Sequence, residues 1–229
     1  MNALTQGHVD HLVVYAETLD VGVRWCVDTL GVTPGPGGEH PLMGTHNRLL
    51  AIASDAFPDA YLEIIACQPG AAPPAAAKRR WFDLDDPHLK ARVARDGPQL
   101  VHWVARVPDA AASVAALAAQ DIDRGDVLEA SRRTATGLLQ WRITVRPDGQ
   151  RLFDGCLPTL IEWKGEPAGR HLPASGLQLH SMALRHPEAR SLRQALGSLG
   201  LEGIGVSVGT PRLRVQLQTP RGLLDLASA

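Results

Sequence analysis

The sequence predicts an α+β fold assembled from repeats of one module, in which a strand is followed by a helix and further strands. The first observation is a short apolar run that opens on a histidine and returns twice along the 229 residues. The second is a helix-like segment after each of these runs. The third is a later strand-like run that carries one carboxylate near its centre. The pairs are His11 with Glu63, His102 with Glu162, and His180 with Asp225.

The composition is that of an ordinary globular protein, and it excludes several classes. With 45% hydrophobic and 21% charged residues and a formal net charge of -1, the chain lacks the basic surface that nucleic-acid binding requires. Its three cysteines show no paired C-x-x-C spacing, so neither a disulfide framework nor a cysteine zinc site is indicated. No apolar run approaches the roughly 18 residues of a spanning helix, and the first residues lack a signal-peptide pattern. We therefore expect a cytoplasmic protein with no nucleic-acid or membrane partner.

The first predicted module covers residues 1–70. Its opening strand alternates so that His11 and Tyr15 share one face, while apolar residues on the other face meet a helix that ends at Gly31. The last strand of the module carries Glu63 on the face that His11 shares if the two strands are neighbours. A strand pair then holds an imidazole and a carboxylate side by side.

The second predicted module covers residues 98–166, after a connector at 71–97, and a partial third module covers 175–229. In the second module, alternation along the first and last strands predicts one inner-face set. That set is His102, Val104 and Arg106 together with Leu160, Glu162 and Lys164. Trp103 and Trp163 are predicted on the helix-covered face. Both modules therefore direct one His and one Glu to the same kind of surface.

Four motifs carry a family resemblance that spans nearly the whole chain. They are Val9-Asp-His-Leu-Val-Val14, Gly44-Thr-His-Asn47, Tyr61-Leu-Glu-Ile-Ile65 and Leu157-Pro-Thr-Leu-Ile-Glu-Trp163. With these motifs the chain resembles the vicinal oxygen chelate superfamily, in particular its glyoxalase-like branch, whose unit is a βαβββ module used in pairs. The resemblance implies the fold shared by glyoxalases, bleomycin-resistance proteins and extradiol dioxygenases, a cupped mixed sheet, here with a shorter third module at the C-terminus.

The resemblance also implies a metal site built from the first and fourth strands of each module. By position, the ligands correspond to His11, Glu63, His102 and Glu162. Two imidazoles and two carboxylates suit Zn(II), Ni(II), Mn(II) or Fe(II), with open positions for two vicinal substrate oxygens. A loosely held carboxylate can leave such a metal and act as the base that moves a proton. Family analogy favours Glu162 over Glu63 for that role.

Substrate-binding candidates follow from the same predicted cup. They are Tyr15, His46, Asn47, Arg106 and Lys164, although His46 and Asn47 stand before a strand, where a backbone-bonding role fits equally well. The favoured function is a divalent-metal-dependent lyase or isomerase that promotes proton transfer on a small vicinal-oxygen substrate. A metal-free protein that binds or sequesters a small molecule is the alternative, and an iron-dependent dioxygenase is a weaker one. Paired modules also allow a homodimer, and His180 with Asp225 is either a repeat relic or a further site.

Overall fold

The computed structural model describes residues 6–71, 74, 79–134 and 137–229, which form two sheets and four α-helices. The helices are α1 (Leu19–Trp25), α2 (Pro87–Asp96), α3 (Ala110–Ala118) and α4 (Ala189–Ser198). The strands are β1 (His8–Tyr15), β2 (Glu39–His40), β3 (Thr45–Ala51), β4 (Tyr61–Cys67), β5 (Gln99–Arg106), β6 (Asp126–Thr134), β7 (Gly137–Val145), β8 (Thr159–Trp163), β9 (Gln178–Arg185), β10 (Gly205–Ser207), β11 (Arg212–Thr219) and β12 (Gly222–Ala227).

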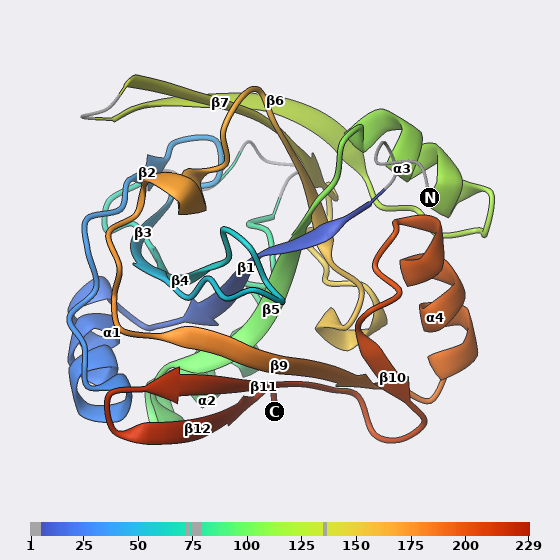
Figure 1. The fold of residues 1–229 in the computed structure, drawn as a ribbon. Coiled ribbons are helices and arrows are strands. Elements are labelled where there is room, and N and C mark those ends of the chain that lie inside the picture. Colours follow the sequence, from blue (N-terminus) through green and yellow to red (C-terminus); the bar gives the residue numbers. More distant parts are fainter. Residues whose placement is uncertain (1–5, 72–73, 75–78, 135–136) are drawn as a thin grey trace.

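Eight strands form the larger sheet, in the order β2-β3-β4-β1-β5-β8-β7-β6. At its centre β1 and β5 are antiparallel, β4 lies parallel to β1, and β8 lies parallel to β5. The two halves of the sheet therefore repeat one arrangement. Figure 1 shows the sheet curling into a half-barrel, with the long hairpin β6–β7 along its top and the second sheet, of order β10-β9-β11-β12, below. The predicted α+β fold, with a cupped mixed sheet of repeated modules and a shorter third one, is confirmed.

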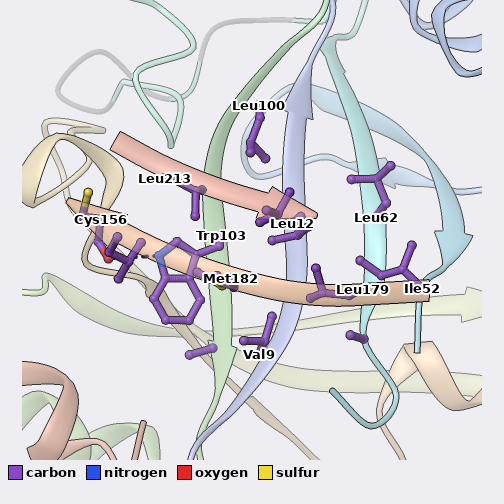
Figure 2. Packing of buried hydrophobic residues seen from close by; sticks show 14 of the residues in the cluster. Val9, Leu12, Ile52, Leu62, Leu100, Trp103, Cys156, Leu179, Met182 and Leu213 are labelled. Atoms are coloured by element: carbon purple, nitrogen blue, oxygen red, sulfur yellow. Dashed lines mark hydrogen bonds between the residues drawn. The ribbon is translucent and has the colours of Figure 1, made fainter. Parts of the chain in front are cut away.

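The outer, convex face of the larger sheet is covered by α1, α3 and the second sheet. Leu12 and Trp103 point to this face and are fully buried there. Figure 2 shows them beneath Leu179 and Met182 of β9 and Leu213 of β11. Burying a large apolar side chain contributes about 1.5–3 kcal/mol, so this layer stabilises the fold. The C-terminal sheet thus covers the back of the cup rather than its inside.

Helix α1 packs closely on β4. The Thr18 hydroxyl caps the helix by accepting a hydrogen bond from the backbone N–H of Val21 at 3.2 Å. At Gly22 an added Cβ would lie 2.4 Å from Cγ2 of Ile64, so only glycine permits this approach. The helix continues as a π-helical turn and ends at Gly31, whose φ of 76° is left-handed.

The segment between the first two modules fills part of the inner face. Phe82, Leu84, Leu89 and Val93 are buried in one cluster with the inner-face residues of β5. Helix α2 begins in this segment after Asp86, whose carboxylate accepts a hydrogen bond from the Leu89 N–H at 2.8 Å. This apolar plug packs against inner-face residues of both modules, and its Phe82 ring lies against His102 of the second.

The module boundaries drawn from the sequence remain predictions. Of the predicted connector at 71–97, residues 72–73 and 75–78 lie outside the described residues. Within the part of the chain that the structure describes, no helix is long and apolar enough to cross a membrane.

Candidate functional site

A β-bulge in β1 shapes the inner face of the first module. Along the β1–β5 ladder Val9 lies opposite Ala105 and His11 lies opposite Val104, so Asp10 is an extra residue with no partner. Side chains alternate along a regular strand, and an extra residue breaks that alternation and re-aims its neighbours. Oδ1 of Asp10 therefore lies 2.7 Å from Nδ1 of His11, the next residue in the chain.

The ring of His11 is held on several sides and is only 5% exposed. Its Nδ1–H donates to Asp10, and the other carboxylate oxygen of Asp10 accepts a hydrogen bond from Nε1 of Trp163 at 2.8 Å. The ring of Tyr61 stacks on the imidazole with 4.5 Å between centroids. Held in this way, Nε2 of His11 lies 3.7 Å from Oε2 of Glu63.

Glu63 is buried on the inner face of β4 and is oriented by an amide. Asn47 of β3 donates from Nδ2 to Oε1 of Glu63 at 2.6 Å, and its own Oδ1 accepts from the Gly38 N–H at 2.7 Å. Nε2 of His40 lies 3.9 Å from Oε1 of Glu63 and 3.3 Å from Nδ2 of Asn47. Burial lowers the pKa of His40 to about 4, so its ring is neutral near pH 7 and can accept from Asn47. Asn47 thus fixes Oε1, and Oε2 is the oxygen that faces His11.

The corresponding position in the second module is closed. His102 is fully buried, with Nδ1 3.3 Å from the Gly155 carbonyl oxygen. Its Nε2 accepts a hydrogen bond from the Thr159 N–H at 3.1 Å and lies 3.1 Å from the Thr159 hydroxyl. The Phe82 ring lies 5.0 Å from the imidazole, and burial holds the pKa of His102 well below its usual range. Both ring nitrogens are therefore engaged within the protein.

Glu162 lies on the outer face, so the inner-face position predicted for it is wrong. Its Oε2 accepts a hydrogen bond from the Ala110 N–H at the start of α3 at 2.9 Å and pairs with Nη1 of Arg142 at 3.2 Å. Leu160 also belongs to the outer cluster, whereas Trp163 faces the inner side. The predicted alternation of β8 was shifted by one residue, and such a shift exchanges the two faces of a strand.

The strand register identifies the residue that occupies the place of Glu63 in the second module. Val13 and Val104 each stand two residues after the histidine of their module. Glu63 is the partner of Val13 on the parallel strand β4, and Thr159 is the partner of Val104 on the parallel strand β8. The counterpart of Glu63 is therefore a threonine, not a carboxylate.

The four residues predicted as metal ligands do not converge. His11 and Glu63 face each other, but His102 is closed in by its own hydrogen bonds and Glu162 lies on the opposite face. Among the described residues, no group of three or more His, Cys, Asp or Glu side chains is arranged to hold a metal ion. The donor types of the predicted quartet suit Zn(II), Ni(II), Mn(II) or Fe(II), but the four residues are too dispersed to bind one such ion together.

Two predicted cup residues and the third histidine–carboxylate pair lie away from His11. Tyr15 is on the inner face, where burial raises its pKa and its hydroxyl lies 3.7 Å from Sγ of Cys67. Nε2 of His46 is buried without a hydrogen-bond partner among the described residues, and burial lowers the pKa of its ring. His180 is exposed on β9, whereas Asp225 forms an ion pair with an arginine of β11.

The two predicted substrate-binding cations are both in ion pairs. Nη1 of Arg106 lies 3.2 Å from Oδ2 of Asp59. Nζ of Lys164 lies 3.1 Å from Oε1 of Glu129, at the rim of a cavity. Each cation therefore already has a carboxylate partner.

Two adjacent cavities lie on the inner face of the sheet, and the His11–Glu63 pair lines the smaller one. We call the deep one the inner chamber; its volume is about 40 Å³, and His11, Asn47, Tyr61 and Glu63 line it. We call the other the outer cavity; its volume is about 300 Å³, and apolar and aromatic side chains dominate its lining. The two cavities share His40, Trp81, Trp141 and Ile143 in their walls. Small ligands bind in cavities of this kind, with few polar groups at one end.

Sequence reasoning missed four residues of this site, namely Asp10, His40, Trp81 and Arg132. Asp10 carried a usable signal, because it adjoins a histidine at the start of a strand. His40 closes a loop rich in Pro and Gly just before the Gly44-Thr-His-Asn47 motif. Trp81 and Arg132 carried none, since only long-range packing brings them to the chamber.

The sequence profile of a glyoxalase-like domain matches residues 9–200. The chain belongs to the glyoxalase-like domain family. The resemblance to the vicinal oxygen chelate superfamily is confirmed, and that superfamily includes enzymes such as epimerases. No curated protein matches the sequence of this glyoxalase-like domain.

Three solved structures are similar to this glyoxalase-like domain, and the first of them supports its fold. The crystal structure of a hypothetical protein from Staphylococcus aureus has 14% sequence identity and a TM-score of 0.59, with 96% of this chain and 85% of that chain covered. Methylmalonyl-CoA epimerase from Mycobacterium tuberculosis has 20% identity and a TM-score of 0.41, with 73% and 94% covered. A mutant of 4-hydroxymandelate synthase from Streptomyces coelicolor has 14% identity and a TM-score of 0.46, with 97% and 63% covered.

Proposed function

We propose that this glyoxalase-like domain is an enzyme that moves a proton on a small substrate with vicinal oxygens, with Glu63 as the base. The observation that carries the proposal is the 3.7 Å approach of the buried Oε2 of Glu63 to Nε2 of His11 in the wall of the inner chamber. A buried carboxylate and imidazole beside a cavity are the groups that general acid–base catalysis requires. The short hydrogen bond from Asn47 goes to the other oxygen of Glu63, Oε1, so it does not engage the oxygen that faces His11.

The reaction needs only proton movements between these groups and the substrate. Glu63 takes a proton from a carbon next to a carbonyl group, and the electron pair of that C–H bond moves onto the carbonyl oxygen to give an enolate. His11, oriented by Asp10, presents Nε2 to the same space and donates to the enolate oxygen when Nε2 is protonated. Return of the proton from Glu63 to the same carbon regenerates the substrate with hydrogen exchange, and return to the neighbouring carbon, with transfer of the hydroxyl proton to the other oxygen, gives an isomer.

The predicted divalent metal has a separate test. Members of the superfamily often bind metals, but only His11 and Glu63 of the predicted quartet converge, so the steps above use the chain's own side chains. We expect less than stoichiometric metal by inductively coupled plasma mass spectrometry after incubation with Zn(II), Ni(II), Mn(II) or Fe(II). One equivalent of metal that is lost in a Glu162→Gln variant would reinstate the quartet.

Hydrogen–deuterium exchange tests the proton transfer without knowledge of the product. The protein is incubated in D₂O with 2-oxo acids, 2-hydroxy ketones and acyl compounds, and NMR follows the loss of the signal from the hydrogen next to the carbonyl. We expect Glu63→Gln to slow the catalysed exchange by about 10²-fold or more, since a positioned base contributes that much. Glu162→Gln is the matched comparison, because its side chain lies on the outer face, and it should retain exchange. Loss in Glu162→Gln with retention in Glu63→Gln would reverse the assignment of the base.

The second candidate function is the binding of a small molecule without turnover. The outer cavity of about 300 Å³ favours it, because a cavity of this size can bind a ligand whether or not Glu63 acts as a base. Compounds that bind the wild type and show no catalysed exchange would support this function. In that case Glu63 and His11 would serve as hydrogen-bonding groups for the ligand.

A further inference from the structure

Two N–H groups in the walls of the cavities have no hydrogen-bond partner among the described residues. They are Nε of Arg132 and Nε1 of Trp81, and both atoms are buried. A buried N–H without an acceptor costs about 1–3 kcal/mol, so native proteins rarely keep two of them at one place. Two such donors beside a cavity indicate a ligand that brings the acceptors.

Arg132 reaches the chamber from the second half of the sheet. It belongs to β6, and its side chain lies across Gly38, where an added Cβ would come within 2.2 Å of Nη1. It lines the inner chamber, as do Glu63 and His40. Glycine at position 38 therefore provides the room for a guanidinium close to the His11–Glu63 pair.

The guanidinium of Arg132 is free of carboxylates, unlike its neighbours in the fold. Arg106 pairs with Asp59, Arg142 pairs with Glu162, and Arg132 forms no ion pair with the described residues. A half-buried guanidinium is stabilised when it meets an oxyanion, and its planar fork matches the two oxygens of a carboxylate. Arg132 is therefore available to pair with the carboxylate of a bound ligand.

The cavity sizes define the rest of the ligand. About 40 Å³ in the inner chamber admits a head of only a few atoms, because a single water already needs about 10–15 Å³ of such a cavity. The outer cavity of about 300 Å³ is walled by side chains such as Met43, Leu128 and Ile143, and it suits an apolar body. Trp81 stands in the wall between the two spaces, where head and body would join.

We infer that the ligand of this cup is a small carboxylic acid with an apolar body, and that Arg132 and Trp81 receive its carboxylate beside Glu63. The inference names the substrate class for the proposed function and rests on it for the chemistry, but not for the binding. The positive charge of Arg132 offsets the repulsion between Glu63 and an incoming anion. Its field already reaches the neighbouring ring, since it helps to lower the pKa of His40, although burial is the larger cause.

Isothermal titration with phenylacetate and its neutral isostere phenylacetamide tests the inference. We expect the wild type to bind the carboxylate at least tenfold more tightly than the amide, because a charge-assisted pair is lost with the amide. Arg132→Met should weaken the binding of phenylacetate at least tenfold and leave the affinity for phenylacetamide unchanged. Arg132→Lys should restore part of the preference for the carboxylate. Trp81→Phe keeps an aromatic ring but removes the N–H, and it should weaken the binding of phenylacetate by a smaller factor.

Arg133→Met is the matched control, because Arg133 is the next residue of β6, carries the same charge and is exposed. It should leave both affinities unchanged. Equal affinity of the wild type for the two probes, failure to bind phenylacetate, or an equal effect of Arg132→Met and Arg133→Met would overturn the inference. Binding and exchange assays on the wild type separate the two proposals. Carboxylate binding without catalysed exchange refutes the proposed function alone. Exchange of neutral carbonyl compounds without a preference for carboxylates refutes this inference alone.

Discussion

Both halves of the cup have a β-bulge just before their histidine, but the bulged residues differ. In β1 the ladder skips Asp10 just before His11, and in β5 it skips Val101 just before His102. The bulged residue of the first half is a carboxylate that holds the imidazole through Nδ1, whereas that of the second half is a buried valine, and Nδ1 of His102 bonds a backbone carbonyl instead. A repeated backbone therefore does not imply a repeated site.

The partner strands widen the difference between the halves. His11 faces Glu63 beside a cavity, and His102 faces Thr159 beneath the Phe82 ring. One half keeps an acid–base pair open to a chamber, and the other half uses the same position for packing. The surroundings of the two histidines therefore differ although their strand positions correspond, and four experiments test this difference.

The largest effect on stability is expected from truncating Phe82, the ring that covers His102. Phe82→Ala should lower the free energy of unfolding by about 3–5 kcal/mol, the range for a buried Phe truncated to Ala. Urea denaturation followed by circular dichroism measures it. Phe57→Ala, at a partly buried position, is the control and should cost less than half as much. Equal losses would show that Phe82 does not close the second half.

Truncating the two histidines should separate function from stability. His11→Ala should reduce catalysed deuterium exchange by about 10²-fold with little change in the unfolding midpoint. His102→Ala should cost about 2–3 kcal/mol of stability, because it leaves the buried Thr159 N–H without its acceptor, and the folded fraction should keep its exchange rate. Paired denaturation and exchange assays on the two variants measure both quantities. Similar profiles for the two variants would mean that the halves are equivalent.

Lowering the pH should destabilise the protein through the buried neutral histidines. The pKa of His40 falls from 6.5 to about 4 on folding, mainly because of burial. Below pH 6.5 His40 becomes protonated in the unfolded chain but not yet in the folded chain. The free energy of unfolding is therefore unaffected by His40 above pH 6.5 and decreases as the pH falls from 6.5 towards 4. Between pH 7 and pH 5 the loss from His40 is about 2 kcal/mol.

His40→Gln should remove that part of the pH dependence, as measured by urea titrations at the two pH values. His180→Gln is the control, since His180 is exposed on β9. An unchanged slope in the His40 variant would contradict the assignment.

The smallest effect concerns the carboxylate that sets the first half apart. Asp10→Asn keeps the shape of the side chain and removes its charge, so the ring of His11 loses a charged partner. We expect catalysed exchange to fall about tenfold, because a charge-assisted hydrogen bond to His11 is replaced by a weaker neutral one. The pH–rate profile should shift at the same time. A change in stability with an unaltered profile would assign Asp10 a structural role.

Local patterns in the sequence determined much of this protein. Alternation of apolar residues placed His11 and Glu63 on one face, helix caps and Gly31 bounded the first helix, and the order of elements gave the α+β fold of repeated modules. These features depend on residues close together in the chain, which is why composition and periodicity suffice for them.

The packing of distant segments determines which half of the cup places a carboxylate and an imidazole beside a cavity. The bulge at Asp10 and the partner of Val104 are properties of strand pairing, and one residue of register moves a side chain such as Glu162 to the other face of the sheet. The approach of Arg132 to the chamber and the burial of Phe82 against His102 join segments far apart in the chain. No local pattern encodes such contacts, because they depend on how distant strands and loops pack together.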